Sequence, residues 1–235
     1  MTATLGIVGG IGPESTVIYY RTIVREYRRL TSESSSASII VNSIDNNKLL
    51  SLASGNKLDQ LAEYLSFELA RLVHAGATVA LLAANTPHLV FPQVQKSSPI
   101  PLISIVECTC RAAKKLGLTR LGLFGTRYTM TGHFYADFFR ENAIALVVPS
   151  RTEQEYIHRK YMTELLVGRV RDDTRNALLR IAEDLVTRSD IDGLVLGGTE
   201  LSLLFEGHGN SAKPVPFLDT TEIHARAAAE FLVKQ

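Results

Sequence analysis

Four short apolar segments of this chain end in small or polar residues, and each is followed at once by a helical pattern. The four ends are Gly9-Gly10-Ile11-Gly12-Pro13, Asn85-Thr86-Pro87, Thr126 with Thr129, and Thr199. A helix start presents unpaired backbone N–H groups and a partial positive charge, so several such ends together favour an anionic ligand such as a carboxylate. Taken singly, Thr86, Thr126 and Thr199 are equally well explained as structural N-caps, with Thr126 or Thr129 at the start of a helix through Phe134 to Phe139. The glycine-rich turn lacks the GxGxxG and Walker spacings, so it gives little support to nucleotide binding.

Three titratable side chains adjoin these ends and are candidate acids or bases. His88 lies one helical turn past Asn85, Glu14 opens the first helix, and Glu200 follows Thr199. A buried Glu or His can be tuned toward neutrality and can then serve as a single base. The alternative is structural, with His88 as a hydrogen-bonded core histidine and the two glutamates as partners of helix dipoles. Weaker candidates are His133, Tyr128 and the segment Glu206-Gly-His208-Gly.

Short apolar runs alternate with longer helical patterns along the chain, which is typical of βαβ units around a mainly parallel sheet. The segments 58–75 and 174–187 predict amphipathic helices because their apolar residues recur every three or four positions. A further helix is predicted over 224–233. The predicted strands are Leu5–Val8, Ser38–Asn42, Val79–Leu82, Pro101–Ile105, Arg120–Phe124, Ala145–Val148, Gly193–Leu196 and Val215–Leu218.

The chain repeats this pattern once. The strand and turn at Leu5 resemble those at Leu121, and the strand end before Ala84 resembles the one before Gly198, with nearly equal spacing. We therefore expect an α/β fold with two similar α/β domains, each with a short, mainly parallel sheet, related by a pseudo-twofold axis. Residues 1–100 with 211–235 would form the first domain and residues 101–210 the second. The ends at Ala84 and Gly198 would then face each other across a ligand cleft.

The composition argues against several classes of protein. The 235 residues carry 25 Lys+Arg and 24 Asp+Glu, so no excess charge attracts nucleic acid or an anionic membrane. No stretch approaches 18 apolar residues and the N-terminus has no charged leader, so we expect a cytoplasmic protein that does not bind a membrane. Cys108 and Cys110 are separated by one residue, a spacing that suits neither a CxxC redox pair nor a zinc site, so we expect no metal.

Five segments, in chain order, together resemble the aspartate/glutamate racemase family. They are Leu5-Gly-Ile-Val-Gly-Gly-Ile-Gly-Pro-Glu-Ser-Thr, Ala84-Asn-Thr-Pro-His88, Gly125-Thr-Arg-Tyr-Thr129, Gly197-Gly-Thr-Glu-Leu201 and Phe217-Leu-Asp-Thr-Thr-Glu-Ile-His224. The resemblance implies two similar α/β domains, a site between them that needs no cofactor, commonly a homodimer, and acidic amino acids as usual substrates. In the family's pattern the strand ends read Cys-Asn-Thr and Gly-Cys-Thr-Glu, and the two cysteines are the acid and the base.

This sequence departs from that pattern at both cysteine positions. Ala84 stands before Asn85, and Gly198 stands before Thr199. Racemisation by two bases removes the α-proton from one face of the substrate and returns a proton on the other. Neither a methyl group nor a hydrogen atom can do this. Cys108 and Cys110 do not substitute for the lost pair, because they fall in a helical pattern where cysteine usually behaves as a small buried hydrophobe.

The positions that hold substrate in the family are better kept. Asn85, Thr86, Thr126 and Thr199 match these positions by motif. We also expect Gly10, Ser43, Lys48 and Thr129 to bind substrate; Ser43 and Asp45 follow the second strand, and Lys48 lies where a basic residue could reach an acidic side chain. Tyr156 stands where many relatives have a lysine for the second carboxylate; His158, Arg159 or Lys160 could compensate, or could form only a solvated helix face.

These residues lead us to expect a cofactor-independent, racemase-family protein that binds a small amino or carboxylic acid. Two-thiol racemisation is expected to be absent or very weak. Two alternatives remain open. One is a non-catalytic protein that binds an acidic metabolite, and the other is a one-base lyase, decarboxylase or isomerase that uses His88, Glu14 or Glu200.

Overall fold

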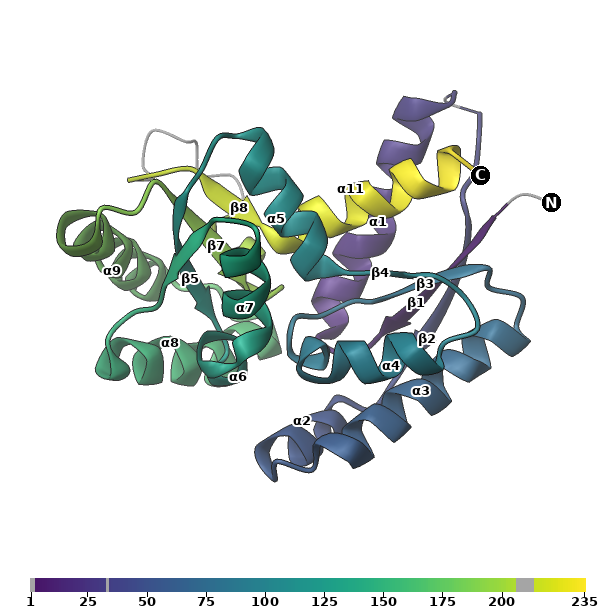
Figure 1. Ribbon diagram of the computed structural model, residues 1–235, viewed down its shortest axis with the longest axis horizontal. Helices are drawn as coiled ribbons and strands as arrows, with labels where there is room; N and C mark the ends of the chain where they lie inside the picture. Colours follow the sequence, from purple (N-terminus) through teal and green to yellow (C-terminus); the bar gives the residue numbers. More distant parts are fainter. Residues whose placement is uncertain (1–2, 33, 206–213) are drawn as a thin grey trace. The chain divides into compact units, whose positions relative to one another are not determined.

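The computed structural model describes residues 3–32, 34–205 and 214–235. The chain forms two units, Met1–Cys108 with Thr221–Gln235 and Thr109–Thr220, which we call the first and the second unit. Each unit contains one four-stranded sheet with helices around it (Figure 1). The expected α/β fold with two similar domains and short parallel sheets is confirmed.

The first unit has the strand order β2-β1-β3-β4, and all its strand pairs are parallel. The chain enters the second unit within α5 and returns to the first at the start of α11. The elements in and leading out of the first unit are β1 (Thr4–Gly9), α1 (Pro13–Leu30), β2 (Ser38–Ser43), α2 (Asn46–Ser54), α3 (Leu58–His74), β3 (Val79–Leu82), the 3₁₀ helix η1 (Thr86–Val90), α4 (Phe91–Ser97), β4 (Leu102–Ile103), α5 (Ile105–Lys115) and α11 (Thr220–Val233).

The central strands β1 and β3 of the first sheet are buried on both faces because they alternate two sets of apolar side chains. Val8 and Leu82 belong to one core together with α2, α3, η1 and α4. Leu5, Ile7 and Val79 belong to another core together with α1, α5 and α11. Figure 1 shows α3 and α4 on one side of this sheet and α1 and α11 on the other.

The second unit has the strand order β6-β5-β7-β8, also with parallel pairs throughout. Its core packs α8 and α9 against Phe124, Leu194 and Leu196 of the sheet. Its elements are β5 (Arg120–Gly125), α6 (Arg127–Thr131), α7 (His133–Glu141), β6 (Ala145–Val147), α8 (Arg151–Thr163), the 3₁₀ helix η2 (Leu165–Val167), α9 (Asp172–Ser189), β7 (Gly193–Gly197), α10 (Leu201–Phe205) and β8 (Phe217–Asp219).

The two sheets share one topology, which is what the internal repeat predicts. Leu5 of β1 pairs with Val79 of β3, and Leu121 of β5 pairs with Gly193 of β7, in the same parallel sense. The central strands β1 and β3 therefore correspond to β5 and β7. In both units the motif residues follow the carboxyl ends of these two central strands, the end of a parallel sheet where ligands bind in α/β folds.

Several strand and helix bounds differ by one or two residues from those predicted, and four differences concern where a helix begins. The strand predicted over Pro101–Ile105 is only Leu102–Ile103, because the Glu107 N–H donates to Ser104 Oγ at 3.3 Å and α5 already begins at Ile105. The last helix begins at Thr220, directly after β8, rather than at 224.

The other two differences concern caps. Asn85, with helical dihedral angles, is the N-cap of η1, so Thr86 is the first residue of that helix and not its cap. Thr126 caps the short helix α6, and the helix that contains Phe134 and Phe139 starts again after Gly132.

Candidate active site

The glycine turn after β1 brings Gly10 next to the end of β2. Gly9 pairs with Ser43 in the parallel register, and the Ile44 N–H donates to the Gly9 carbonyl at 2.9 Å. Gly10 has a φ of +77°, and a Cβ placed on it would lie 2.5 Å from Ser43 Oγ and 2.7 Å from the backbone of Ile44. Only glycine fits both this backbone angle and this close approach. Two predicted substrate-binding residues, Gly10 and Ser43, therefore lie side by side.

The start of α2 follows directly. Asp45 caps this helix, because its Oδ1 accepts from the Asn47 N–H at 2.9 Å. Lys48 Nζ lies 4.2 Å from the centre of the Tyr64 ring, so its cation is held over an aromatic face. Among the described residues, Asn46 Oδ1 is a buried side-chain oxygen without a hydrogen-bond partner. The sequence did not point to Asn46, because an asparagine near a helix start is usually exposed. A buried acceptor of this kind calls for a donor.

The end of β3 places Ala84, Asn85 and Thr86 in succession, all buried. His88 packs back onto this turn. Its Nδ1 donates to the Ala84 carbonyl at 3.2 Å, its Nε2 accepts from the Ile105 N–H at 3.3 Å, and its ring stacks on Phe91. Burial, with a smaller contribution from His224, lowers the pKa of His88 to about 3. His88 is therefore a neutral imidazole at pH 7, with both ring nitrogens bonded to the backbone.

The end of β5 holds a pair of buried threonines. Thr126 Oγ1 accepts from the Thr129 N–H at 3.3 Å and lies 3.2 Å from Thr129 Oγ1. A Cβ placed on either Gly125 or Gly197 would meet the Thr129 side chain at 2.9 Å. Thr129 therefore lies against the ends of both central strands of the second sheet, and the threonine pair borders the end of β7.

The end of β7 leads into a buried polar cluster of Thr199, Glu200 and Tyr161. Thr199 Oγ1 donates to Glu200 Oε2 at 2.9 Å, and the Tyr161 hydroxyl donates to the same oxygen. Burial, reinforced by the Glu200 carboxylate, raises the pKa of Tyr161 well above 10. Tyr161 comes from α8 and was not among the residues singled out by the sequence.

The first unit thus assembles Gly10 and Ser43 on one strand pair, with Asn85 and Thr86 at the neighbouring strand end. The second assembles its threonines with Gly198 and Glu200. Among the remaining candidates, Glu14 is exposed in the first turn of α1, and Lys48 is exposed on α2. His133 opens α7, and the Tyr128 ring contacts the His158 ring edge-on. Glu206 and His208 lie outside the described residues.

Comparison with known proteins shows the family to which the chain belongs. A family profile described as Asp/Glu/Hydantoin racemase matches residues 8–228. The chain belongs to this racemase family.

Solved structures of racemase-family proteins are similar to this chain over nearly its whole length. A putative Asp/Glu racemase from Yersinia pestis is 33% identical with a TM-score of 0.87, and covers 98% of this chain and 99% of its own. An aspartate racemase homologue from Pyrococcus horikoshii OT3 is 31% identical with a TM-score of 0.82, with the same coverage. The aspartate racemase of Picrophilus torridus is 20% identical with a TM-score of 0.76, covering 98% of this chain and 94% of its own, and shows the shared fold.

In this racemase-family chain the basic segment of α8 is bonded within the protein. Lys160 Nζ donates to Glu164 Oε1 at 2.5 Å, the Arg127 N–H donates to His158 Nδ1 at 3.2 Å, and Arg159 lies over the Tyr156 ring. The positions considered for a second carboxylate therefore already have partners in α8 or next to it.

Cys108 and Cys110 are both buried in α5, at 3% and 2% exposure. Burial raises the pKa of the Cys110 thiol, which opposes formation of a nucleophilic thiolate there. Within the described residues, no group of three or more His, Cys, Asp or Glu side chains is placed to hold a metal ion. Among the helices of those same ranges, none combines the length and apolar character that crossing a bilayer requires.

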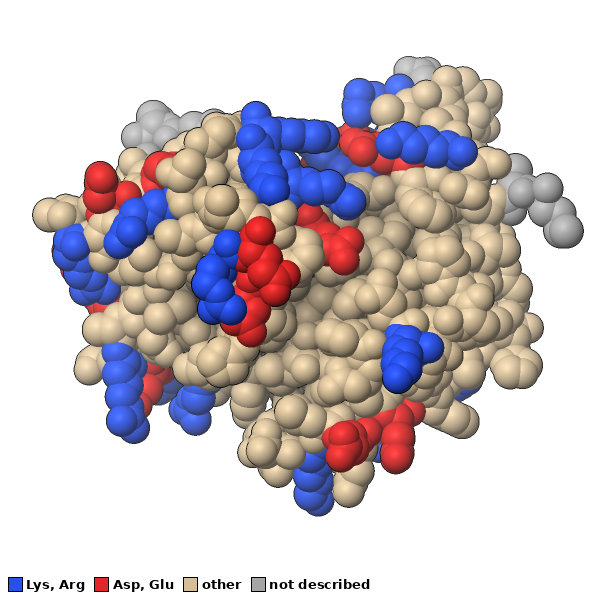
Figure 2. All heavy atoms as spheres, in the orientation of Figure 1, with Lys and Arg blue, Asp and Glu red and all other residues tan. Residues whose placement is uncertain are grey.

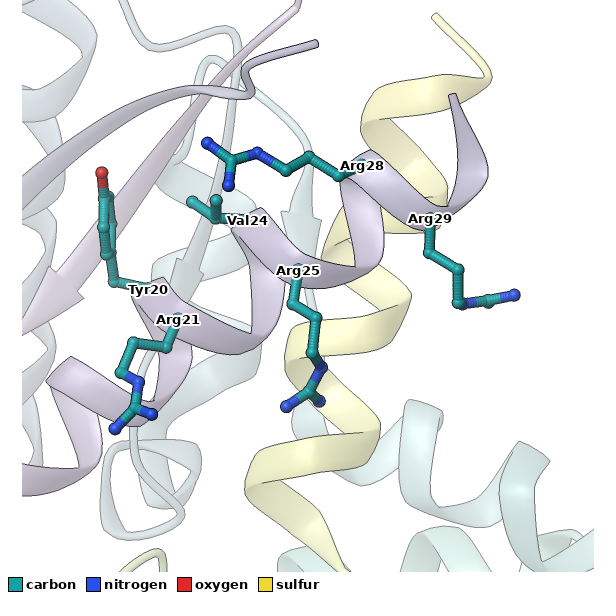
Figure 3. Close-up of a pocket in the computed structure, with 6 residues that line it drawn as sticks. All are labelled: Tyr20, Arg21, Val24, Arg25, Arg28 and Arg29. Carbon is teal, nitrogen blue, oxygen red and sulfur yellow. The ribbon is translucent and has the colours of Figure 1, made fainter. Parts of the chain in front are cut away.

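A surface hollow of about 780 Å³ runs along α1 (Figure 3). It is lined by Tyr20, Arg21, Val24, Arg25, Arg28 and Arg29, none of which belongs to the racemase motifs. Arg25 pairs with Glu222 and Arg29 pairs with Glu26, so part of its positive charge is neutralised locally. Figure 2 likewise shows basic and acidic side chains mixed on the visible face.

Proposed function

We propose that this racemase-family chain binds a small amino or carboxylic acid, without a cofactor, through residues at the carboxyl ends of its central strands. In the first unit these are Gly10, Ser43, Asn85 and Thr86, and Asn46 Oδ1 adds an acceptor suited to a ligand ammonium or hydroxyl group. In the second unit they are Thr126, Thr129 and Thr199. The buried hydroxyl and amide groups of Asn85 and Thr86 in the first unit, and of the three threonines in the second, support the proposal, because they can bind a carboxylate that is shielded from water.

We also propose that racemisation by two thiols is absent or very weak in this protein. The observation that carries this is the presence of Ala84 at the end of β3 and Gly198 at the end of β7, inside otherwise intact motifs. A positioned acid or base typically contributes about 10²- to 10⁴-fold in rate, so losing both removes most of the chemical advantage.

The surroundings of the three candidate bases, His88, Glu14 and Glu200, favour a second candidate function, the binding of an acidic metabolite without turnover. His88 is neutral and bonded to the backbone through both nitrogens. Glu200 accepts from Thr199 and Tyr161, and Glu14 is exposed. A one-base lyase or isomerase requires one of these groups to leave its present partners or environment, whereas simple binding requires no such change.

Incubation with L- and D-aspartate and L- and D-glutamate in D₂O tests the loss of racemisation. We expect no α-deuteration above the rate without enzyme, because the two positions carry no ionisable group. Proton NMR of the α-hydrogen measures exchange, and chiral chromatography measures inversion. Rapid deuteration accompanied by racemisation would show that other residues supply the acid and the base.

Binding is tested separately by calorimetry with the same four amino acids. Thr126→Val is expected to weaken binding about tenfold, which corresponds to about 1.4 kcal/mol for a lost hydrogen bond to a charged ligand. Thr131→Val is the matched control, since Thr131 is exposed on the same helix and donates only to the Arg127 carbonyl at 2.9 Å. If Thr126→Val lowers stability while affinity is unchanged, Thr126 is only a cap and the proposed contact is wrong.

A further inference from the structure

The space beside Gly198 is filled by one side chain. A Cβ placed on this glycine would lie 2.5 Å from Cε2 of Tyr161, and its next two neighbours, at 3.2 and 3.3 Å, are also atoms of that ring. The backbone is not the obstacle, because Gly198 is not among the glycines with positive φ. Gly10 differs, since both its φ and the nearby backbone of Ile44 exclude a side chain.

The Tyr161 ring is firmly held in that position. It lies on α8 at 5% exposure and packs in the core of the second unit with Ile157 and Leu165. Its hydroxyl donates to Glu200 Oε2, two residues beyond Gly198. Moving the ring would disturb both this hydrogen bond and a close-packed core, and such cores accommodate added atoms only at a cost in stability.

We propose that Tyr161 occupies the volume that a side chain at position 198 would need, so that Tyr161 and Gly198 form one coupled feature. The end of β7 therefore differs in two respects: position 198 carries no side chain, and the Tyr161 ring fills the space that such a side chain would occupy. In this role Tyr161 leaves no room for a reactive side chain at position 198. It does not take over as a base, because its raised pKa keeps the phenol protonated at neutral pH.

The coupling is tested by a double-mutant cycle that does not depend on any activity. Gly198→Ala in the wild type is expected to lower Tm by about 3 to 10 °C, as overpacking does in a chain of this size. In the Tyr161→Leu background the same change is expected to leave Tm unchanged or to raise it, because the ring is gone. Tyr161→Phe is the control: it keeps the ring and loses only the hydroxyl, so the full penalty of Gly198→Ala should persist.

If Gly198→Ala shifts Tm equally in the wild-type, Phe and Leu backgrounds, or has no effect in the wild type, the inference is overturned. Should Tyr161→Leu not fold, Tyr161→Met supplies the same test with a longer, flexible side chain that can make room for a Cβ.

The functional consequence rests on the proposed function and is tested in the double variant Ala84→Cys/Gly198→Cys, which restores both motif thiols. α-Deuteration of aspartate or glutamate is expected to rise at least 100-fold when Tyr161→Leu is added, and to stay at background when Tyr161→Phe is added. Equal exchange in the two triple variants, above background, would refute the role of the ring. Coupled Tm values without exchange in either triple variant would support the packing role of Tyr161 and count against the proposed site.

Discussion

Between pH 6.5 and pH 4 this protein is expected to lose about 3 kcal/mol of folding stability through His88 alone, since each pH unit between the folded and unfolded pKa values costs about 1.4 kcal/mol. The pKa of His88 falls from 6.5 to about 3 on folding, because the imidazole is buried. Below pH 6.5 the unfolded chain binds a proton at this residue and the folded chain does not. The contribution is therefore fully present above pH 6.5 and is lost as the pH falls toward 3.

Urea denaturation at several pH values, for the wild type and for His88→Gln, measures this effect. The Gln amide can donate to the Ala84 carbonyl and accept from the Ile105 N–H as the imidazole does, but it does not titrate. The loss of stability with falling pH should be shallower in His88→Gln than in the wild type. His74→Gln is the control, since His74 is exposed at the end of α3. Parallel curves for wild type and His88→Gln would contradict this prediction, because they would mean that the pKa of His88 is not lowered on folding.

The two hydrogen bonds of the neutral His88 ring also affect the candidate site. The imidazole ties the turn at Ala84 to the start of α5, so it positions Asn85 and Thr86 at the end of β3. From the sequence, His88 could be either a base or a hydrogen-bonded core histidine, and these contacts support the second role. Spacing places a histidine one turn past Asn85 but does not reveal that two backbone groups bond to its ring.

The fold was largely predictable because its signals are local. The eight strands of the described residues were expected from short apolar runs, and the helices predicted over 58–75 and 174–187 from their three- and four-residue periodicity correspond to α3 and α9. The caps were predicted less well. Thr86 and Thr126 looked like caps of the helices that follow, but a helical Asn85 starts η1 one residue earlier, and Gly132 separates α6 from α7. Such details depend on one or two dihedral angles that residue type does not determine.

The environment of Gly198 could not be predicted, for a different reason. A glycine in the motif indicates only that a side chain is missing. What replaces it depends on α8 packing against the end of β7, which brings Tyr161 within contact distance of a residue far along the chain. Tyr161 also lies in a segment whose neighbouring charged residues suggested substrate binding. Nothing in its periodicity separates it from the other apolar positions of the helix.

His224→Ala is expected to be the most destabilising single change considered for this chain, at about 3 to 5 kcal/mol. His224 is fully buried at the start of α11. Its Nε2 donates to the Ile103 carbonyl of β4 at 2.9 Å, and the Tyr19 hydroxyl of α1 donates to its Nδ1 at 2.8 Å. One ring therefore joins the last helix of the chain to the edge strand and to the first helix. Alanine would leave a cavity and deprive two buried polar groups of these bonds.

Urea denaturation measures the free energy of unfolding of His224→Ala and of Arg226→Ala. The comparison shows whether the loss comes from the His224 hydrogen bonds or from any substitution in α11. Arg226 is exposed on the same helix and pairs with the half-buried Glu222 at 2.8 Å and, more weakly, with Glu26 at 4.0 Å. Ion pairs of an exposed arginine are typically worth about 1 kcal/mol or less, so its loss should cost less than the loss of His224. Similar losses in the two variants would contradict the assignment. His224 closes the last of the five racemase-like segments, so a large loss confined to stability, with amino-acid binding retained by the folded fraction, would show that a family motif residue here maintains the fold of the first unit.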